Sequence, residues 1–298
     1  MMRRKVNEII GQIPAWANAK DIQIDSLEGL TNTNYLVVVD DERFVLRVAG
    51  ENTIRLGITR ELEIEALLAA SEAGIGPQVV HFILPEGHMV TRYIDGRHWT
   101  LDEYRKRSNI QRIVETLKRL HTLPQIKATF SPFCRVDEYA KQASALGVPF
   151  PQDFDKFQQK MTVIKKDQAR DTYPWERFCH NDLFCVNVLD NGDVRFVDWE
   201  FAGVGDIYFD LATLFYAYDS ADTLPPELGE YLLECYFGEV SATNWKRLEG
   251  MKYMLMFFSA MWGMLQYGLQ IEGSVRIIEG FDFLKYAAAT FEEMRRTF

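Results

Sequence analysis

The sequence predicts an α+β protein in which a small strand-rich lobe precedes a larger, mostly helical lobe. The chain has 298 residues, 47% of them hydrophobic and 26% charged, which is typical of globular proteins. Short runs with period-two alternation are concentrated before residue 94. Beyond that point, apolar residues recur mainly at intervals of three and four, as in amphipathic helices. We therefore expect lobes at residues 1–93 and 94–298.

The small lobe begins with a short amphipathic helix, in which Val6, Ile9, Ile10 and Ile13 share one face. Alternating apolar residues then predict five strands, at 22–27, 35–40, 44–48, 79–83 and 88–94. One helix lies between the third and fourth strands, beginning after Thr59 and ending at Gly74. This order predicts a five-stranded antiparallel sheet with one inserted helix.

The large lobe is predicted to be helical apart from one hairpin. Apolar periodicity indicates helices at 110–121, 136–146, 154–168, 227–237, 243–270 and 274–296. The exception is the stretch 186–197, which is β-like and has Asn191-Gly192 at its centre. That dipeptide is a strong signal for a two-residue hairpin turn.

The net charge of the chain bears on its binding partners, and its cysteines bear on the cellular compartment. The formal net charge is −10 and the pI is about 5.1, which argues against a nucleic-acid partner, because such a partner requires clustered basic charge. The four cysteines form no CxxC pair, and no apolar leader opens the chain. A reducing cytoplasm is therefore expected. No pattern predicts an oligomeric state.

One uncharged stretch, 253–271, is long enough to be tested as a membrane span. It contains Gln266 and Gln270 as well as two glycines. We therefore expect a buried core helix rather than a membrane span.

The most informative motif is His180-x-Asp182-x4-Asn187, followed after the hairpin by Asp198. Phosphoryl transfer from a nucleotide requires one carboxylate to orient the attacking hydroxyl and accept its proton, together with oxygen ligands for Mg²⁺. Asp182 is predicted to be the catalytic base, with Asn187 and Asp198 as metal ligands. Any one of these residues could merely stabilise a turn. The three together, at this spacing, favour the catalytic interpretation, and His180 is expected to be structural.

The motif resembles the choline/ethanolamine kinase family, which belongs with the aminoglycoside phosphotransferases to a kinase-like superfamily. Further similar segments are Leu30–Leu36, Phe44–Val48, Gly74–Pro77, Leu120-His121, Val197–Asp206 and Phe209–Ala212. The resemblance implies a two-lobed protein-kinase-like fold that holds ATP and Mg²⁺ in its cleft.

The resemblance also implies a nucleotide site in the small lobe. Only Gly29 precedes the segment containing Thr31, Asn32 and Asn34, whose amides and short side chains would replace a glycine-rich phosphate loop. Arg47 stands where kinases have a strand lysine, and its guanidinium can hold phosphate oxygens as a fork.

The same resemblance implies roles for three more residues. Glu63 is the helix acid expected to pair with Arg47. Thr91 and Tyr93, between the lobes, would supply backbone hydrogen bonds to adenine.

The acceptor is expected to be a small cationic alcohol. Segments 259–265 and 281–287 resemble the family helices that surround an ammonium group with aromatic rings. Trp262 and Tyr286 match that pattern, whereas Leu265 and Phe283 differ from it. Trp262, Phe283 and Tyr286 are therefore the predicted substrate residues. Choline is the expected acceptor, or else ethanolamine. The alternatives are an aminoglycoside or thiamine-type phosphotransferase and a non-catalytic pseudokinase.

Overall fold

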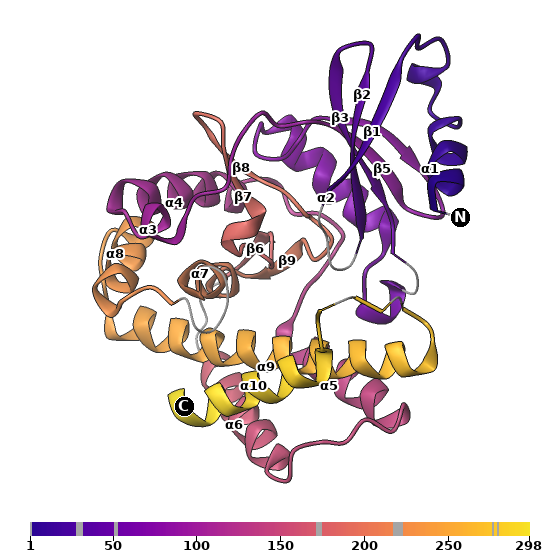
Figure 1. Cartoon of the computed structure of the whole chain (residues 1–298). Helices are drawn as coiled ribbons and strands as arrows, with labels where there is room; N and C mark the ends of the chain where they lie inside the picture. Colours follow the sequence, from indigo (N-terminus) through magenta and orange to yellow (C-terminus); the bar gives the residue numbers. More distant parts are fainter. Residues whose placement is uncertain are drawn as a thin grey trace.

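The chain forms two lobes, a small β-rich lobe and a larger helical one (Figure 1). This computed structural model describes residues 2–27, 32–50, 53–170, 175–216, 223–275, 277–278 and 280–298, with side chains from Val6 onward. Thr31 and Gly29 lie outside the described residues. The predicted fold class, an α+β two-lobed kinase-like fold, is confirmed.

The small lobe is built on one antiparallel sheet of five strands in the order β1-β2-β3-β5-β4. The strands are β1 (Ile22–Leu27), β2 (Thr33–Val39), β3 (Glu42–Val48), β4 (Val79–Ile83) and β5 (His88–Arg92). Asp40 and Asp41 connect β2 to β3 with positive φ values of 46° and 72°, which suit a tight hairpin turn. All five predicted strands are therefore present.

The two faces of this sheet have different partners. Helix α1 (Met2–Ile10) and the 3-10 turn η1 (Pro14–Trp16) cover one face, where Phe44, Leu46 and Val48 join their apolar cluster. Arg47 belongs to the opposite face and contacts α2 (Arg60–Glu72). A second 3-10 turn, η2 (Thr53–Leu56), precedes α2. The alternation along β3 therefore directs the charged side chain of Arg47 towards α2, on the face opposite the apolar cluster.

The large lobe is assembled around one long helix, α9 (Ala242–Glu272), which packs against α5, α7 and α10 (Figure 1). The other helices are α3 (Leu101–Tyr104), α4 (Arg107–His121), α5 (Pro132–Ala145), α6 (Phe154–Gln168), α7 (Ile207–Tyr216), α8 (Pro226–Phe237) and α10 (Phe283–Thr297). Among the residues with a described placement, no helix combines the length and the apolarity needed to cross a membrane.

Two parts of the large lobe differ from the prediction. The helix expected from Ser274 begins only at Phe283, because Gly273 ends α9 in a left-handed conformation and the Asp282 side chain caps α10. The prediction of helix over 274–282 is therefore wrong for the described residues. Helix α7 was not predicted, since all ten of its residues are buried and it has no polar face to reveal a helical period.

Two short ribbons support the loop that carries the motif. The predicted hairpin is present as β7 (Val188–Asp190) and β8 (Val194–Phe196), preceded by the 3-10 turn η3 (Cys185–Asn187). Strands β6 (Glu176–Cys179) and β9 (Gly203–Asp206) also pair, which the sequence did not predict. The loop between β6 and β7 is thus held at both ends by strands.

Candidate active site

Helix α7 anchors the loop through Asp210, whose side chain is fully buried. Its carboxylate accepts hydrogen bonds from the backbone N–H groups of His180, at 2.9 Å, and Asn181, at 2.6 Å. The His121 ring contacts the same carboxylate at 3.0 Å through Nε2. Asn181 has a positive φ of 64°, so the chain turns sharply just before Asp182. Asp210 thus fixes the backbone of the loop immediately before Asp182.

His180 links this loop to the segment after β8. Its Nε2 donates to the carbonyl oxygen of Val197 at 3.0 Å, and its ring lies 4.6 Å from that of Trp199. Burial lowers the pKa of His180 to about 4, so the imidazole is neutral near pH 7. These contacts support the residue immediately before Asp198.

The structure brings the three residues of the motif together. The Asn187 side-chain amide donates both to the Asp182 backbone carbonyl, at 2.7 Å, and to its carboxylate, at 2.9 Å. The Val197 N–H donates to the Asn187 carbonyl at 3.0 Å, which places Asp198 beside this pair. Asp198 has a positive φ of 64° and an exposed side chain. One loop and one hairpin therefore bring these side chains to the same place.

The carboxylates of Asp198 and Glu200 lie near that of Asp182. Burial raises the pKa of Asp182 well above its usual range, and the charges of Asp198 and Glu200 raise it further. A divalent cation would relieve this repulsion, and the oxygen atoms of Asn187 and Asp198 are the hard donors that Mg²⁺ prefers. These residues therefore fit a magnesium site.

On the small-lobe side, Arg47 and Glu63 form a buried ion pair. Both terminal nitrogens of Arg47 contact the Glu63 carboxylate, Nη2 at 2.8 Å from Oε2. Burial acts to lower the pKa of Arg47, but the charge and hydrogen bonding of Glu63, together with the charges of Glu200 and Asp198, outweigh it and the pKa is raised. Burial likewise acts against the Glu63 charge, yet Arg47 and Arg60 lower its pKa overall. Both groups are therefore charged in the folded protein.

Asn32 is buried, and its side chain is hydrogen-bonded within the protein. Its amide nitrogen donates to the Glu200 carboxylate at 2.9 Å. A phosphate contact from Asn32 would therefore have to come from its backbone. Asn34 stands opposite Arg47 in the β2–β3 register, whereas Thr31 lies outside the described residues.

Glu200 and Arg60 are two site residues to which the sequence assigned no role. Burial, with the nearby Asp198 and Glu63 carboxylates, raises the pKa of Glu200 to about 7. Arg60 lies 3.6 Å from the Glu200 carboxylate. The available signal was the position of Glu200 only two residues after the predicted metal ligand Asp198.

The predicted adenine contacts lie at the junction of the lobes. Thr91 is buried in β5 and stands opposite Val45 in the neighbouring strand β3. The Tyr93 N–H already donates to the Arg43 carbonyl at 3.1 Å. A backbone contact from Tyr93 to adenine would therefore require its carbonyl oxygen.

The three predicted aromatic residues meet where α10 crosses α9. The Trp262 ring lies 5.4 Å from Phe283 and 6.0 Å from Tyr286, in edge-to-face arrangements. Phe281, which the sequence analysis did not select, is 5.6 Å from Tyr286. Gly263 makes this crossing possible, since a Cβ there would lie 2.9 Å from the Tyr286 ring. Trp262 and Tyr286 remain half-buried, so part of each ring is accessible.

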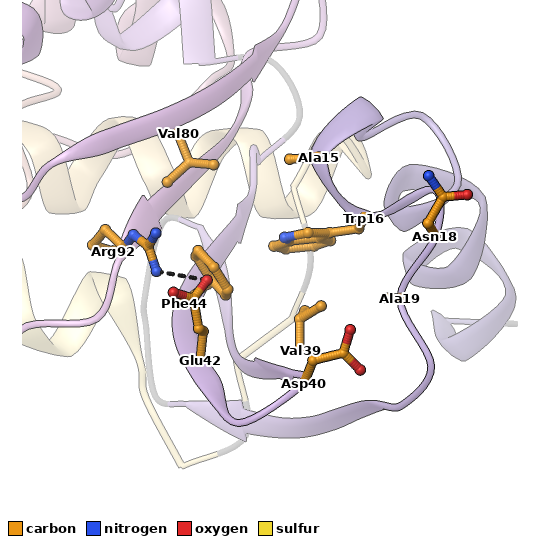
Figure 2. A pocket seen from close by; sticks show the side chains of 10 residues that line it. All are labelled: Ala15, Trp16, Asn18, Ala19, Val39, Asp40, Glu42, Phe44, Val80 and Arg92. Atoms are coloured by element: carbon orange, nitrogen blue, oxygen red, sulfur yellow. Dashed lines mark ion pairs between the residues drawn. The ribbon is translucent and has the colours of Figure 1, made fainter.

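A separate hollow of about 340 Å³ lies on the outer face of the small lobe (Figure 2). Trp16 and Phe44 meet there at 5.2 Å, and Arg92 stacks on Phe44 at 4.7 Å while pairing with Glu42. None of the predicted site residues lines this hollow.

A strand-rich lobe against a helical lobe, with an acidic loop held between short ribbons, defines the class of kinase-like phosphotransferases. Residues 24–250 match the APH family, described as "Phosphotransferase enzyme family". The chain belongs to this family. The resemblance found in the sequence is therefore confirmed.

Individual relatives show the same relationship. Protein LicA of Haemophilus influenzae is 29% identical over 237 residues, which cover 74% of this chain but only 64% of that protein. Ethanolamine kinase 2 of Rattus norvegicus is 25% identical over 89% of this chain and 73% of its own length. The crystal structure of a choline/ethanolamine kinase family protein from Mesorhizobium loti has a TM-score of 0.81 and 26% identity, covering 99% of this chain and 94% of that one.

Proposed function

We propose that this chain is an ATP- and Mg²⁺-dependent kinase that phosphorylates the hydroxyl of an amino alcohol, choline or else ethanolamine. The observation that carries the proposal is the cluster of Asp182, Asn187 and Asp198, which brings a half-buried carboxylate beside oxygen donors suited to Mg²⁺. The names of the relatives support a small alcohol as the acceptor.

Each polar residue has a separate task in this proposal. Asp182 orients the acceptor hydroxyl and accepts its proton as the oxygen attacks the γ-phosphate. Arg47, oriented by Glu63, contacts the phosphate oxygens. Asn187 and Asp198 would hold Mg²⁺, which when bound neutralises charge on the phosphates. The catalytic loop keeps its geometry because Asp210 and His180 anchor it.

The aromatic group of Trp262, Phe283 and Tyr286 is proposed to receive the ammonium end of the acceptor. Ring faces can replace part of the hydration of a buried cation, and Trp is the most favourable partner. The half-buried rings of Trp262 and Tyr286 leave surface for such a contact. This favours a compact ammonium alcohol over an aminoglycoside or a thiamine-type alcohol.

A catalytic protein is favoured over a pseudokinase, because the base and both candidate metal ligands are present and assembled. We also propose the cytoplasm as the compartment. The observation in its favour is that all four cysteines are free thiols.

The test compares the wild type with Asp182→Asn on ATP and a panel of choline, ethanolamine, thiamine and aminoglycosides. We expect choline turnover by the wild type and a loss of about 10²–10⁴-fold in kcat in the variant, because an amide cannot accept the proton. Asp193→Asn, in the exposed hairpin turn, is the matched control and should leave kcat unchanged. If the wild type phosphorylates an aminoglycoside or thiamine faster than choline and ethanolamine, the proposed acceptor is wrong. A variant that retains more than about half the wild-type kcat would exclude Asp182 as the base.

A further inference from the structure

Arg60 occupies the middle of the buried ionic cluster, although the proposed chemistry does not use it. It is the first residue of α2 and only 6% exposed. Its Nη1 lies 2.6 Å from Glu63 and 3.6 Å from Glu200, and its Nη2 donates to the Asn32 side-chain oxygen at 3.2 Å. One guanidinium therefore contacts three polar side chains from separate segments.

These three segments carry different parts of the proposed nucleotide site. Glu63 orients Arg47, and Glu200 follows the candidate metal ligand Asp198. Asn32 belongs to the segment of the predicted phosphate loop, and its side-chain oxygen also accepts the backbone N–H of Gly50 at 3.2 Å. Asn32 also donates to Glu200 at 2.9 Å, so Arg60, Asn32 and Glu200 each contact the other two.

Charge explains why a second arginine is needed here. Asp198, Glu200 and Glu63 place three carboxylates near Arg47, and the Arg60 guanidinium lies 2.6 Å from Glu63 and 3.6 Å from Glu200. Without Arg60, Arg47 would be the main counter-ion of this group. A guanidinium drawn among several carboxylates is less available to a phosphate.

The stem of Arg60 is also held in place. It passes over Gly87 in the β4–β5 turn, where a Cβ would lie 2.4 Å from the Arg60 Cγ. Gly87 has a φ of 80°, a conformation that glycine adopts without strain. The side chain therefore has a defined course from α2 to the cleft.

We propose that Arg60 is a positioning residue that holds Asn32, α2 and the segment after Asp198 in the geometry that binds ATP. The inference rests on the proposed function for its choice of nucleotide. It predicts that Arg60 acts on ATP affinity through Asn32 and Glu200, without touching the acceptor.

The experiment measures binding of a non-hydrolysable ATP analogue with Mg²⁺ by calorimetry, in the absence of any acceptor. Arg60→Met should weaken binding by about 10-fold or more, because the contacts with Asn32 and Glu200 are lost. Arg60→Lys keeps the charge but cannot reach three partners at once, so it should recover only part of the affinity. Arg295→Met removes an ion-paired arginine on α10, far along the chain from the cleft, and should leave the affinity unchanged.

A double-mutant cycle tests the route of the effect. In an Asn32→Ala background, Arg60→Met should weaken binding by less than about threefold, since the two residues act as one unit. If the loss of affinity in the double variant instead equals the product of the losses in Arg60→Met and Asn32→Ala, Arg60 does not act through Asn32. If Arg60→Met does not fold, Arg60→Lys alone decides, with an expected loss of about 3- to 10-fold.

Kinetics add a readout that a merely structural residue would not move. KM for ATP should rise in the Arg60 variants while KM for choline changes less than about twofold. ATP affinity within twofold of the wild type in both variants, with only a lower Tm, would overturn the inference alone. A wild-type chain that binds the analogue but phosphorylates no alcohol would overturn the proposed function alone. A wild-type chain that does not bind the analogue would overturn both.

Discussion

Arg47 keeps its positive charge in a site that is nearly closed to water, where an unpaired guanidinium would be costly. Glu63 offsets this cost with two contacts, and the pair gives Arg47 one orientation. In the proposed function, Arg47 is therefore oriented before an anionic ligand binds. An oriented charge of this kind contributes to binding without further ordering of the side chain.

Arg47→Ala is expected to raise KM for ATP by about 10- to 100-fold, because it removes a contact with ground-state phosphates and leaves Glu63 facing Arg60 alone. Arg47→Lys should recover part of this loss. Steady-state kinetics with varied ATP at saturating choline measure both values. An unchanged KM in the alanine variant would remove Arg47 from the nucleotide site.

His180 gives the folded protein a pH dependence of its own. Its pKa is about 4 in the folded state, below the ordinary value of 6.5, because burial disfavours the imidazolium. Between these values the unfolded chain binds the proton more tightly than the folded one. The free energy of unfolding should therefore fall as pH decreases from about 6.5 to about 4, by at most on the order of 3 kcal/mol.

His180→Gln should remove this part of the pH dependence, whatever its effect on stability at pH 7. Urea unfolding of both proteins at pH 7 and pH 5 makes the comparison. His81→Gln, in the half-buried strand β4, is the matched control and should leave the wild-type slope in place. An equal loss of stability between the two pH values in wild type and His180→Gln would contradict the assignment.

At the scale of elements, the crossing of α10 over α9 creates the proposed acceptor pocket. Gly263 allows the close approach, and the Asp282 cap sets where α10 begins. Trp262 therefore meets Phe283 and Tyr286 through the geometry of two helices rather than through a local motif. Substitutions in α9 or α10 should therefore alter binding of the acceptor without disturbing the loop that carries Asp182.

Trp262→Leu is expected to raise KM for choline by about 10- to 30-fold, the factor equivalent to losing about 1.5–2 kcal/mol of cation–π contact. KM for ATP should change little. Phe257→Leu is the matched control on α9, because Phe257 is fully buried among Phe154, Phe157 and Phe291. That control should lower Tm and leave KM for choline unchanged. If Trp262→Leu behaves like the control, Trp262 is a core residue.

At the scale of the whole molecule, the segment around η2 attaches the small lobe to the large one. The Tyr139 hydroxyl on α5 donates to the Leu56 carbonyl at 2.7 Å, and Arg135 donates to the Gly57 carbonyl at 2.9 Å. Arg55 pairs with Glu272 at the end of α9, at 2.6 Å. The lobes are thus joined at this side of the molecule as well as through the connection after β5.

Tyr139→Phe should lower the free energy of unfolding by about 1–3 kcal/mol, since a buried carbonyl loses its donor. Hydrogen exchange should also become faster in the segment around η2. Tyr253→Phe is the matched control, because its hydroxyl makes a similar 2.8 Å bond to Phe157 within the large lobe. The control should lose similar stability without faster exchange near η2. Equal exchange in both variants would show that this contact does not couple the lobes.

The elements and the motif whose causes are local can be predicted from the sequence. Alternation along β3 separates Phe44 and Leu46 from Arg47, and the Asn191-Gly192 turn brings Asn187 near Asp198, whatever surrounds them. These features follow from chain geometry over a few residues. They could therefore be predicted without knowledge of the fold.

Features that depend on residues far apart in the chain became visible only in the folded structure. Helix α7 is buried on all sides and has no period to reveal it, and the start of α10 depends on a cap rather than on apolar spacing. Arg60 and Glu200 resemble ordinary charged residues until the fold places them 3.6 Å apart, although 139 residues separate them in the sequence. Their role depends on a buried environment with several nearby charges, which residues from distant segments form together. No short stretch of sequence contains that environment, so the role could not be predicted.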